Sequence, residues 1–92
     1  MLTLQELEIF LTAAEHENFS EAGRQLNMSQ SAVSQAVQKI ENHFGRKLFN
    51  RCGRRVQLSE TGELLMALAK ELLADATRLE ETMAAIDDST AV

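Results

Sequence analysis

The stretch SQSAVSQAVQKIE, residues 29–41, decides the fold of this 92-residue chain. Its apolar residues fall on one side of a helix, because successive helical residues turn by about 100°. With the next turn added, the expected buried stripe is Val33, Val37, Ile40 and Phe44. The opposite side carries serine and glutamine, where a solvated helix usually carries charged residues. Hydroxyl and carboxamide groups can hydrogen-bond to base edges in the major groove, so this polar side is a candidate contact surface for DNA.

Two more helices are expected before this stretch, and capping residues mark where the helices start. Thr3 and Glu6 have the spacing of a capping box. Ser20 and Ser29 are the expected N-caps of the second and third helices. The second and third helices, joined by the turn Asn27-Met28, form a helix-turn-helix, which places its later helix in the major groove. The three expected helices cover about 4–16, 21–26 and 30–43.

A basic hairpin is expected after the third helix. The short runs 47–50 and 55–58 flank a four-residue turn, RCGR, which is typical of a two-stranded hairpin. Arg51, Arg54 and Arg55 give the hairpin positive charge, which suits DNA phosphates beside the major groove. The hairpin is therefore a candidate wing.

A long helix is expected from the N-cap Ser59 to about Ile86. At 1.5 Å per residue it is roughly 40 Å long, longer than the core of so small a domain can cover. Its leucines and alanines recur in a heptad pattern, which indicates pairing with another helix. The sequence therefore predicts a homodimer. The expected dimer contacts are Leu65, Leu68, Ala69, Leu72, Ala76, Leu79, Met83 and Ile86.

Charge is unevenly distributed along the chain. The formal net charge of −5 by itself argues against DNA, because phosphate binding relies on lysine and arginine. Residues 1–19 carry four acids and no lysine or arginine, and residues 60–92 carry eight acids and two bases. Residues 20–59 carry seven bases and two acids. The bases thus gather in the helix-turn-helix and the hairpin, and this distribution favours nucleic acid.

Length and composition exclude several classes of protein. Ninety-two residues with 45% hydrophobic content suit one small core, and a buried enzyme cleft is hard to build at this size. Cys52, His16 and His43 are the chain's only Cys and His residues, so we expect no metal site, no cofactor and no catalytic activity. The sequence has no run of about 18 apolar residues and no secretory signal, which predicts a cytoplasmic, nucleoid-associated protein.

Five short motifs follow one another within residues 19–62: FS, SQSAVS, IENHFG, LFNR and LSETG. Their order and spacing resemble the winged helix-turn-helix of LysR-type transcriptional regulators, and the resemblance extends over about residues 2–87. It implies a bacterial transcription factor that dimerises through the long helix and binds double-stranded promoter DNA. It also implies that the family's effector-binding domain is missing from this chain, so no small-molecule effector is expected to bind this segment.

We therefore expect a mainly α fold with two parts and a short tail. Residues 1–58 form the winged helix-turn-helix domain, residues 59–88 the linker helix for dimerisation, and residues 89–92 a disordered tail. The expected base-contacting residues are Gln30, Ser31, Ser34, Gln35 and Gln38. The expected phosphate-contacting residues are Ser20, Ser29, Lys39, Arg51, Arg54 and Arg55. For Lys39, an ion pair with a nearby acid is the alternative.

Two other classes of function fit the same residues. A polar helix face is usually just solvated, and the long acidic helix is suited to holding a protein partner, which describes a protein-interaction module. A non-specific, architectural DNA-binding protein is the other alternative. A preference for one DNA sequence over another separates both from a sequence-specific regulator.

Overall fold

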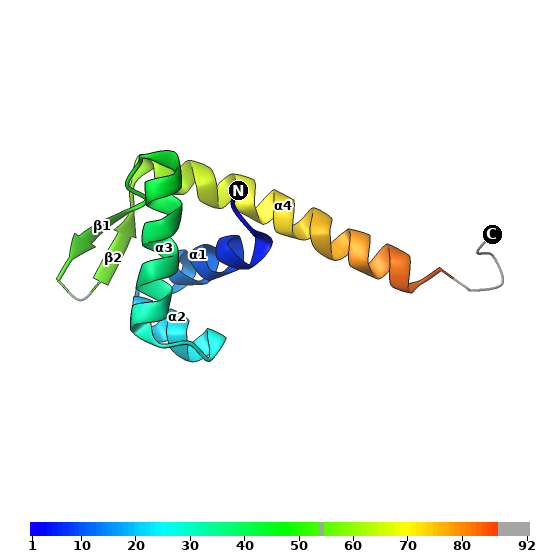
Figure 1. Cartoon of the computed structure of the whole chain (residues 1–92), viewed down its shortest axis with the longest axis horizontal. Coiled ribbons are helices and arrows are strands. Elements are labelled where there is room, and N and C mark those ends of the chain that lie inside the picture. Colours follow the sequence, from blue (N-terminus) through cyan, green and yellow to red (C-terminus); the bar gives the residue numbers. More distant parts are fainter. Residues whose placement is uncertain (54, 87–92) are drawn as a thin grey trace.

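The computed structural model describes residues 1–53 and 55–86, and its fold is a winged helix-turn-helix followed by a long helix. Figure 1 shows the first three helices and the hairpin gathered at one end of the molecule, from which the last helix extends. The mainly α fold class predicted from the sequence is confirmed. The elements in chain order are α1 (Leu4–His16), α2 (Phe19–Leu26), α3 (Gln30–Phe44), β1 (Phe49–Cys52), β2 (Arg55–Leu58) and α4 (Glu60–Ala84).

Side-chain caps start each helix, and one of them differs from the prediction. Thr3 forms the expected capping box with Glu6, and Ser29 accepts from the backbone N–H of Ala32 at 3.0 Å. The start of α2, however, is capped by Asn18 rather than by Ser20. Glu17 adopts a left-handed conformation (φ 52°), so the chain turns from α1 directly into α2 and the second helix begins two residues earlier than predicted.

The turn between α2 and α3 closes tightly onto α2. The backbone N–H of Met28 donates to the Gly23 carbonyl at 2.8 Å, and Asn27 takes a left-handed conformation with φ 56°. A Cβ at position 23 would lie 2.5 Å from the Met28 carbonyl oxygen. Glycine at this position therefore lets α3 start close against α2, which fixes how the third helix is presented.

The core lies between α1, α2, α3 and the hairpin. Phe49 packs against Phe10 and Phe19 with ring centroids 5.5 and 5.3 Å apart. The predicted burial of Phe44 is wrong, because its side chain is 49% exposed. The chain reverses at Gly45 (φ 65°), and Leu48, which is 1% exposed, enters the core instead. The buried members of this core are Ile9, Phe10, Ala13, Ala14, Phe19, Ala22, Val33, Val37, Ile40, Leu48, Phe49 and Val56.

The hairpin is a two-stranded antiparallel sheet in which Phe49 faces Leu58 and Arg51 faces Val56. Its first strand starts two residues later than expected, so Arg51 lies on the strand and not in the turn. The residues just before β1 are held by α3, because the backbone N–H of Leu48 donates to the Glu41 carboxylate at 2.7 Å. This shift moves Arg51 from the tip of the hairpin to its middle.

The long helix α4 packs against α1 over its first turns and then continues away from the core. Ala69 is 1% exposed, and Leu65 and Met66 pack against the core cluster. Gly62 lies in the first turn, where an added Cβ would overlap the Leu48 carbonyl oxygen. Within residues 1–53 and 55–86, no helix is long and apolar enough to cross a membrane.

Candidate nucleic-acid interface

The polar side of α3 faces away from the core. Val33, Val37 and Ile40 are at most 3% exposed and anchor the other side of the helix. Ser34 is half-buried beside the hairpin. The remaining predicted base-contacting residues are exposed to solvent: Gln30, Ser31, Gln35 and Gln38. The structure thus brings all five predicted base-contacting residues to one helix face that is accessible to a partner.

Two serines fix the beginning of α3. The Ser20 hydroxyl hydrogen-bonds to Gln30 Oε1 at 3.0 Å, which links α2 to the first residue of α3. The Ser29 hydroxyl accepts from Ala32 as the N-cap, and its own proton remains able to donate. Both predicted phosphate-contacting serines therefore lie at the end of α3 where unpaired backbone N–H groups favour an anion.

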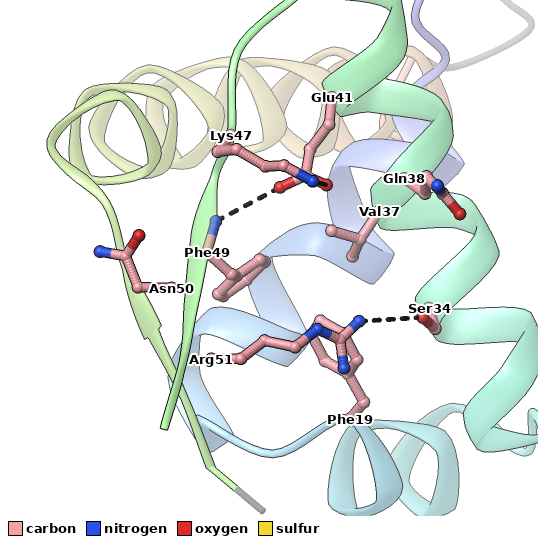
Figure 2. Close-up of a pocket in the computed structure, with 9 residues that line it drawn as sticks. All are labelled: Phe19, Ser34, Val37, Gln38, Glu41, Lys47, Phe49, Asn50 and Arg51. Carbon is pink, nitrogen blue, oxygen red and sulfur yellow. Dashed lines mark hydrogen bonds and ion pairs between the residues drawn. The ribbon is translucent and has the colours of Figure 1, made fainter. Parts of the chain in front are cut away.

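Arg51 points from β1 across a groove toward α3, as Figure 2 shows. Its Nη2 donates to Ser34 Oγ at 3.5 Å, and its guanidinium carbon lies 5.3 Å from the centroid of the Phe19 ring. The groove has a volume of about 490 Å³. Its lining comes from α2, α3, β1 and the residues before β1: Phe19, Ser34, Val37, Gln38, Glu41, Lys47, Phe49, Asn50 and Arg51. The wing arginine thus lies beside the polar face of α3.

Other predicted phosphate contacts are engaged by acids of the same chain. Lys39 Nζ lies 3.1 Å from Glu6 Oε2, so the alternative considered for Lys39 is the arrangement observed. Arg55 Nη2 lies 3.3 Å from Glu17 Oε2. Both ion pairs join elements, since Lys39 ties α3 to α1 and Arg55 ties the hairpin to the α1–α2 junction. Arg54 lies outside the described residues.

Contacts with Thr3 and Lys39 perturb the carboxyl group of Glu6. Its Oε1 accepts from the Thr3 backbone N–H at 2.9 Å, and its Oε2 faces Lys39. The Thr3 backbone N–H, followed by Lys39, lowers the pKa of Glu6 below its ordinary value. Glu6 is therefore held in its ionised form, which both the capping box and the ion pair require.

Ion pairing reduces the positive charge of the basic segment. Arg24 pairs with Glu21 at 2.6 Å, and Lys47 approaches Glu41 at 4.0 Å. Within the part of the chain that the structure describes, Arg46 and Arg51 have no carboxylate within 4.0 Å. Of these two, only Arg51 lines the groove beside α3. Among the described residues, Arg51 is therefore the cation without an acidic partner that lies nearest the candidate base-contacting surface.

An apolar stripe runs along the outer side of α4, and its position differs from part of the predicted seam. Ala69 is buried against its own chain, and Leu65 and Ala76 are partly covered by it. Leu64 was not predicted, although it precedes Leu68 by one helical turn. The exposed residues of this outer stripe are Leu64, Leu68, Leu72, Leu79, Met83 and Ile86, each between 47% and 62% exposed.

Comparisons with known proteins agree with this geometry. Residues 4–63 match the model of the bacterial regulatory helix-turn-helix proteins of the lysR family. The chain is similar to the HTH-type transcriptional regulator YfeR of Shigella flexneri, with 44% identity over 71 residues covering 77% of this chain and 23% of that protein. It is also similar to the HTH-type transcriptional regulator CfxR of Cupriavidus necator, with 37% identity covering 95% and 27%, respectively. Among solved structures, a CbnR_DBD–DNA complex superposes with a TM-score of 0.86 at 26% identity, covering 91% of this chain and 97% of that one.

Proposed function

The chain belongs to the LysR family of bacterial regulatory helix-turn-helix proteins, and we propose that it binds double-stranded promoter DNA sequence-specifically, as a homodimer. The family comprises transcriptional regulators and not enzymes. The chain spans about a quarter of the length of YfeR and of CfxR. We accordingly assign it the DNA-binding role of such a regulator, carried out in the cytoplasm on the nucleoid.

The observation that carries this proposal is the exposed polar face of α3 beside an unpaired arginine. Serine and glutamine side chains discriminate bases by hydrogen bonds, and an arginine without an acidic partner is free to interact with DNA. The similarity to CbnR_DBD, which was solved in complex with DNA, supports DNA as the partner of this chain. We propose that α3 enters the major groove and contacts bases through Gln30, Ser31, Ser34, Gln35 and Gln38.

The proposed phosphate contacts are residues that lie beside α3. Ser20 and Ser29 lie at the start of α3, and Arg51 lies beside its middle. We propose that these three, together with Arg54 and Arg55 of the hairpin, approach the phosphates. Lys39 is assigned to holding α3 on α1, because its ion pair with Glu6 has a length of 3.1 Å.

The outer stripe of α4 supports the homodimer. Exposure of large apolar side chains along one side of a helix is unfavourable in water, and a second apolar surface that buries them stabilises the protein. We propose that residues 1–58 form the DNA-binding domain and that α4, described from Glu60 to Ala84, is the dimerisation helix. The end of the predicted 59–88 segment and the predicted tail 89–92 lie outside the described residues. A second copy would cover the six outer-stripe residues, while Leu65, Ala69 and Ala76 keep their packing within the chain.

Selection from a randomised duplex library at about physiological salt tests the proposed function, because charge contacts dominate binding at lower salt. Sequencing of the bound fraction should return one preferred sequence with two related half-sites, since a symmetric dimer binds a palindrome. Binding without an enriched sequence would instead show an architectural DNA-binding protein. Absence of binding would favour a protein partner for the acidic helix α4.

A further inference from the structure

Ser34 lies on the candidate base-contacting face, and its hydroxyl oxygen already faces a donor. Arg51 Nη2 is 3.5 Å from Ser34 Oγ. A guanidinium carries five N–H donors and no acceptor, so the serine oxygen is the acceptor in this contact whatever the rotation of the hydroxyl. The Ser34 proton is consequently directed away from Arg51.

Arg51 is held in place by more than this long hydrogen bond. Phe49 and Arg51 lie on the same face of β1, because alternate residues of a strand share a face. Phe49 is buried, and its ring packs against that of Phe19, over which the Arg51 guanidinium lies at 5.3 Å. Figure 2 shows Phe19 below the guanidinium and Ser34 at its end. The strand and the aromatic ring together fix the charge beside Ser34.

Among the described residues, no carboxylate lies within 4.0 Å of Arg51, so no ion pair competes with its contact to Ser34. The serine oxygen keeps a second lone pair. A base amino group that approached this lone pair would come close to the guanidinium N–H groups, which places one donor beside another. A base acceptor that approached the hydroxyl proton meets no such conflict.

We propose that Arg51 makes Ser34 a hydrogen-bond donor and that Ser34 therefore contacts the keto oxygen of a guanine or a thymine. This inference rests on the DNA binding proposed above and specifies the base edge that Ser34 recognises. In the major groove, guanine O6 and thymine O4 are acceptors, whereas the amino groups of adenine and cytosine are donors. Arg51 acts in this as a positioning residue, since it orients Ser34.

The test compares binding to duplexes that lack single base groups. The library selection is repeated with Ser34→Ala, and the position that loses its preference is the one that Ser34 contacts. At that position, 2-aminopurine or 5-methyl-2-pyrimidinone removes the keto oxygen of guanine or thymine, and purine or 2-pyrimidinone removes the amino group of the paired adenine or cytosine. Each duplex is measured with wild type and with Ser34→Ala, because this comparison cancels the effect of weaker base pairing.

Deletion of the keto oxygen should weaken the DNA binding of wild type about five-fold more than it weakens the DNA binding of Ser34→Ala. A five-fold difference corresponds to one hydrogen bond of about 1 kcal/mol. Deletion of the amino group should affect both proteins equally. In Arg51→Met, the extra loss on keto deletion should fall to about two-fold or less, because the hydroxyl is no longer oriented. Arg46→Met is the matched control: it removes the same charge from a described residue that has no carboxylate within 4.0 Å and lies outside the groove, and it should keep the five-fold loss.

Three results would overturn the inference while leaving sequence-specific DNA binding intact, and the first of them would also remove Ser34 from the base contacts. The first is an enriched site at which Ser34→Ala changes no base preference. The second is a wild-type loss on amino deletion instead of keto deletion. The third is an undiminished keto effect in Arg51→Met. A library without any enriched sequence would overturn the proposed function together with this inference, so the two failures are distinguishable.

Discussion

Gly62 sets how closely α4 approaches the hairpin, and Gly62→Ala should measurably destabilise the protein. An alanine Cβ would overlap the Leu48 carbonyl oxygen and would lie 2.8 Å from Leu58 Cδ2. Carbon atoms pack at about 3.5–4.0 Å, so the start of α4 or the Leu48 backbone has to move by on the order of 1 Å. Leu48 is 1% exposed, and its carbonyl accepts from the Ser59 N–H at 2.9 Å. Movement of the Leu48 backbone or of the start of α4 therefore disturbs the core or this hydrogen bond.

The magnitude follows from two opposed effects. Overpacking of a tight site costs about 1–3 kcal/mol. The better helix propensity of alanine offsets at most about 1 kcal/mol of this, and less in the first turn. We expect a net loss of about 1–2 kcal/mol, which lowers the Tm of a domain of this size by about 5–15 °C.

Thermal unfolding followed by circular dichroism measures this loss, at one protein concentration because a dimer's Tm depends on concentration. Gly45→Ala is the control: its Cβ meets nothing within 4 Å, and it carries only the cost of a left-handed backbone at φ 65°, about 1–2 kcal/mol. Gly62 has no such backbone requirement, so its loss reports the close approach less the gain in helix propensity. A Tm of Gly62→Ala equal to or above wild type would refute the reasoning.

Three further predictions concern the interface, the base contacts and the acid response. The double variant Leu72→Asp/Leu79→Asp should be monomeric in sedimentation, because it places two charges in the outer stripe of α4; a persistent dimer would place the interface elsewhere. Gln35→Ala should relax the preference at one base position by about 1–3 kcal/mol, and equal weakening on preferred and scrambled duplexes would remove Gln35 from the base contacts. Glu6 has a lowered pKa when folded, so its contribution to stability is complete above its unfolded pKa and is lost as the pH falls through the folded pKa. Glu6→Gln should therefore flatten the acid side of a stability–pH profile, and an unchanged profile would contradict the role of the Lys39 and Thr3 contacts.

Elements with local signals were predictable from the sequence. The bounds of α1 agree with the prediction because the capping box of Thr3 and Glu6 and the apolar face point to the same helix. The start of α2 was predicted two residues too late, because Asn18 and Ser20 are both good N-caps and only the left-handed Glu17 decides between them. Local capping patterns thus place a helix more reliably than they place its first residue.

Features that depend on tertiary packing were harder to predict. The apolar residues of α4 form one broad face in the sequence, and only the position of α1 divides it into residues that pack within the chain, such as Ala69, and residues left exposed, such as Leu72. Phe44 continues the stripe of α3 by periodicity, yet the reversal at Gly45 brings Leu48 into the core. The ion pair of Lys39 with Glu6 joins residues far apart in the sequence, so no spacing rule reveals it.

The ion pairs of the basic segment also affect how such a protein searches a chromosome. Lys39 and Arg24 are paired with Glu6 and Glu21, so two of its cations are already matched before any nucleic acid arrives. Each DNA phosphate that the protein leaves without a cationic partner weakens its non-specific binding. A genome offers roughly 10⁶–10⁹ competing non-specific sites. Brief residence on each wrong site leaves more molecules free to sample the next one. For the sequence-specific binding proposed above, these ion pairs leave less of the protein bound at non-specific sites and more of it available to its preferred site.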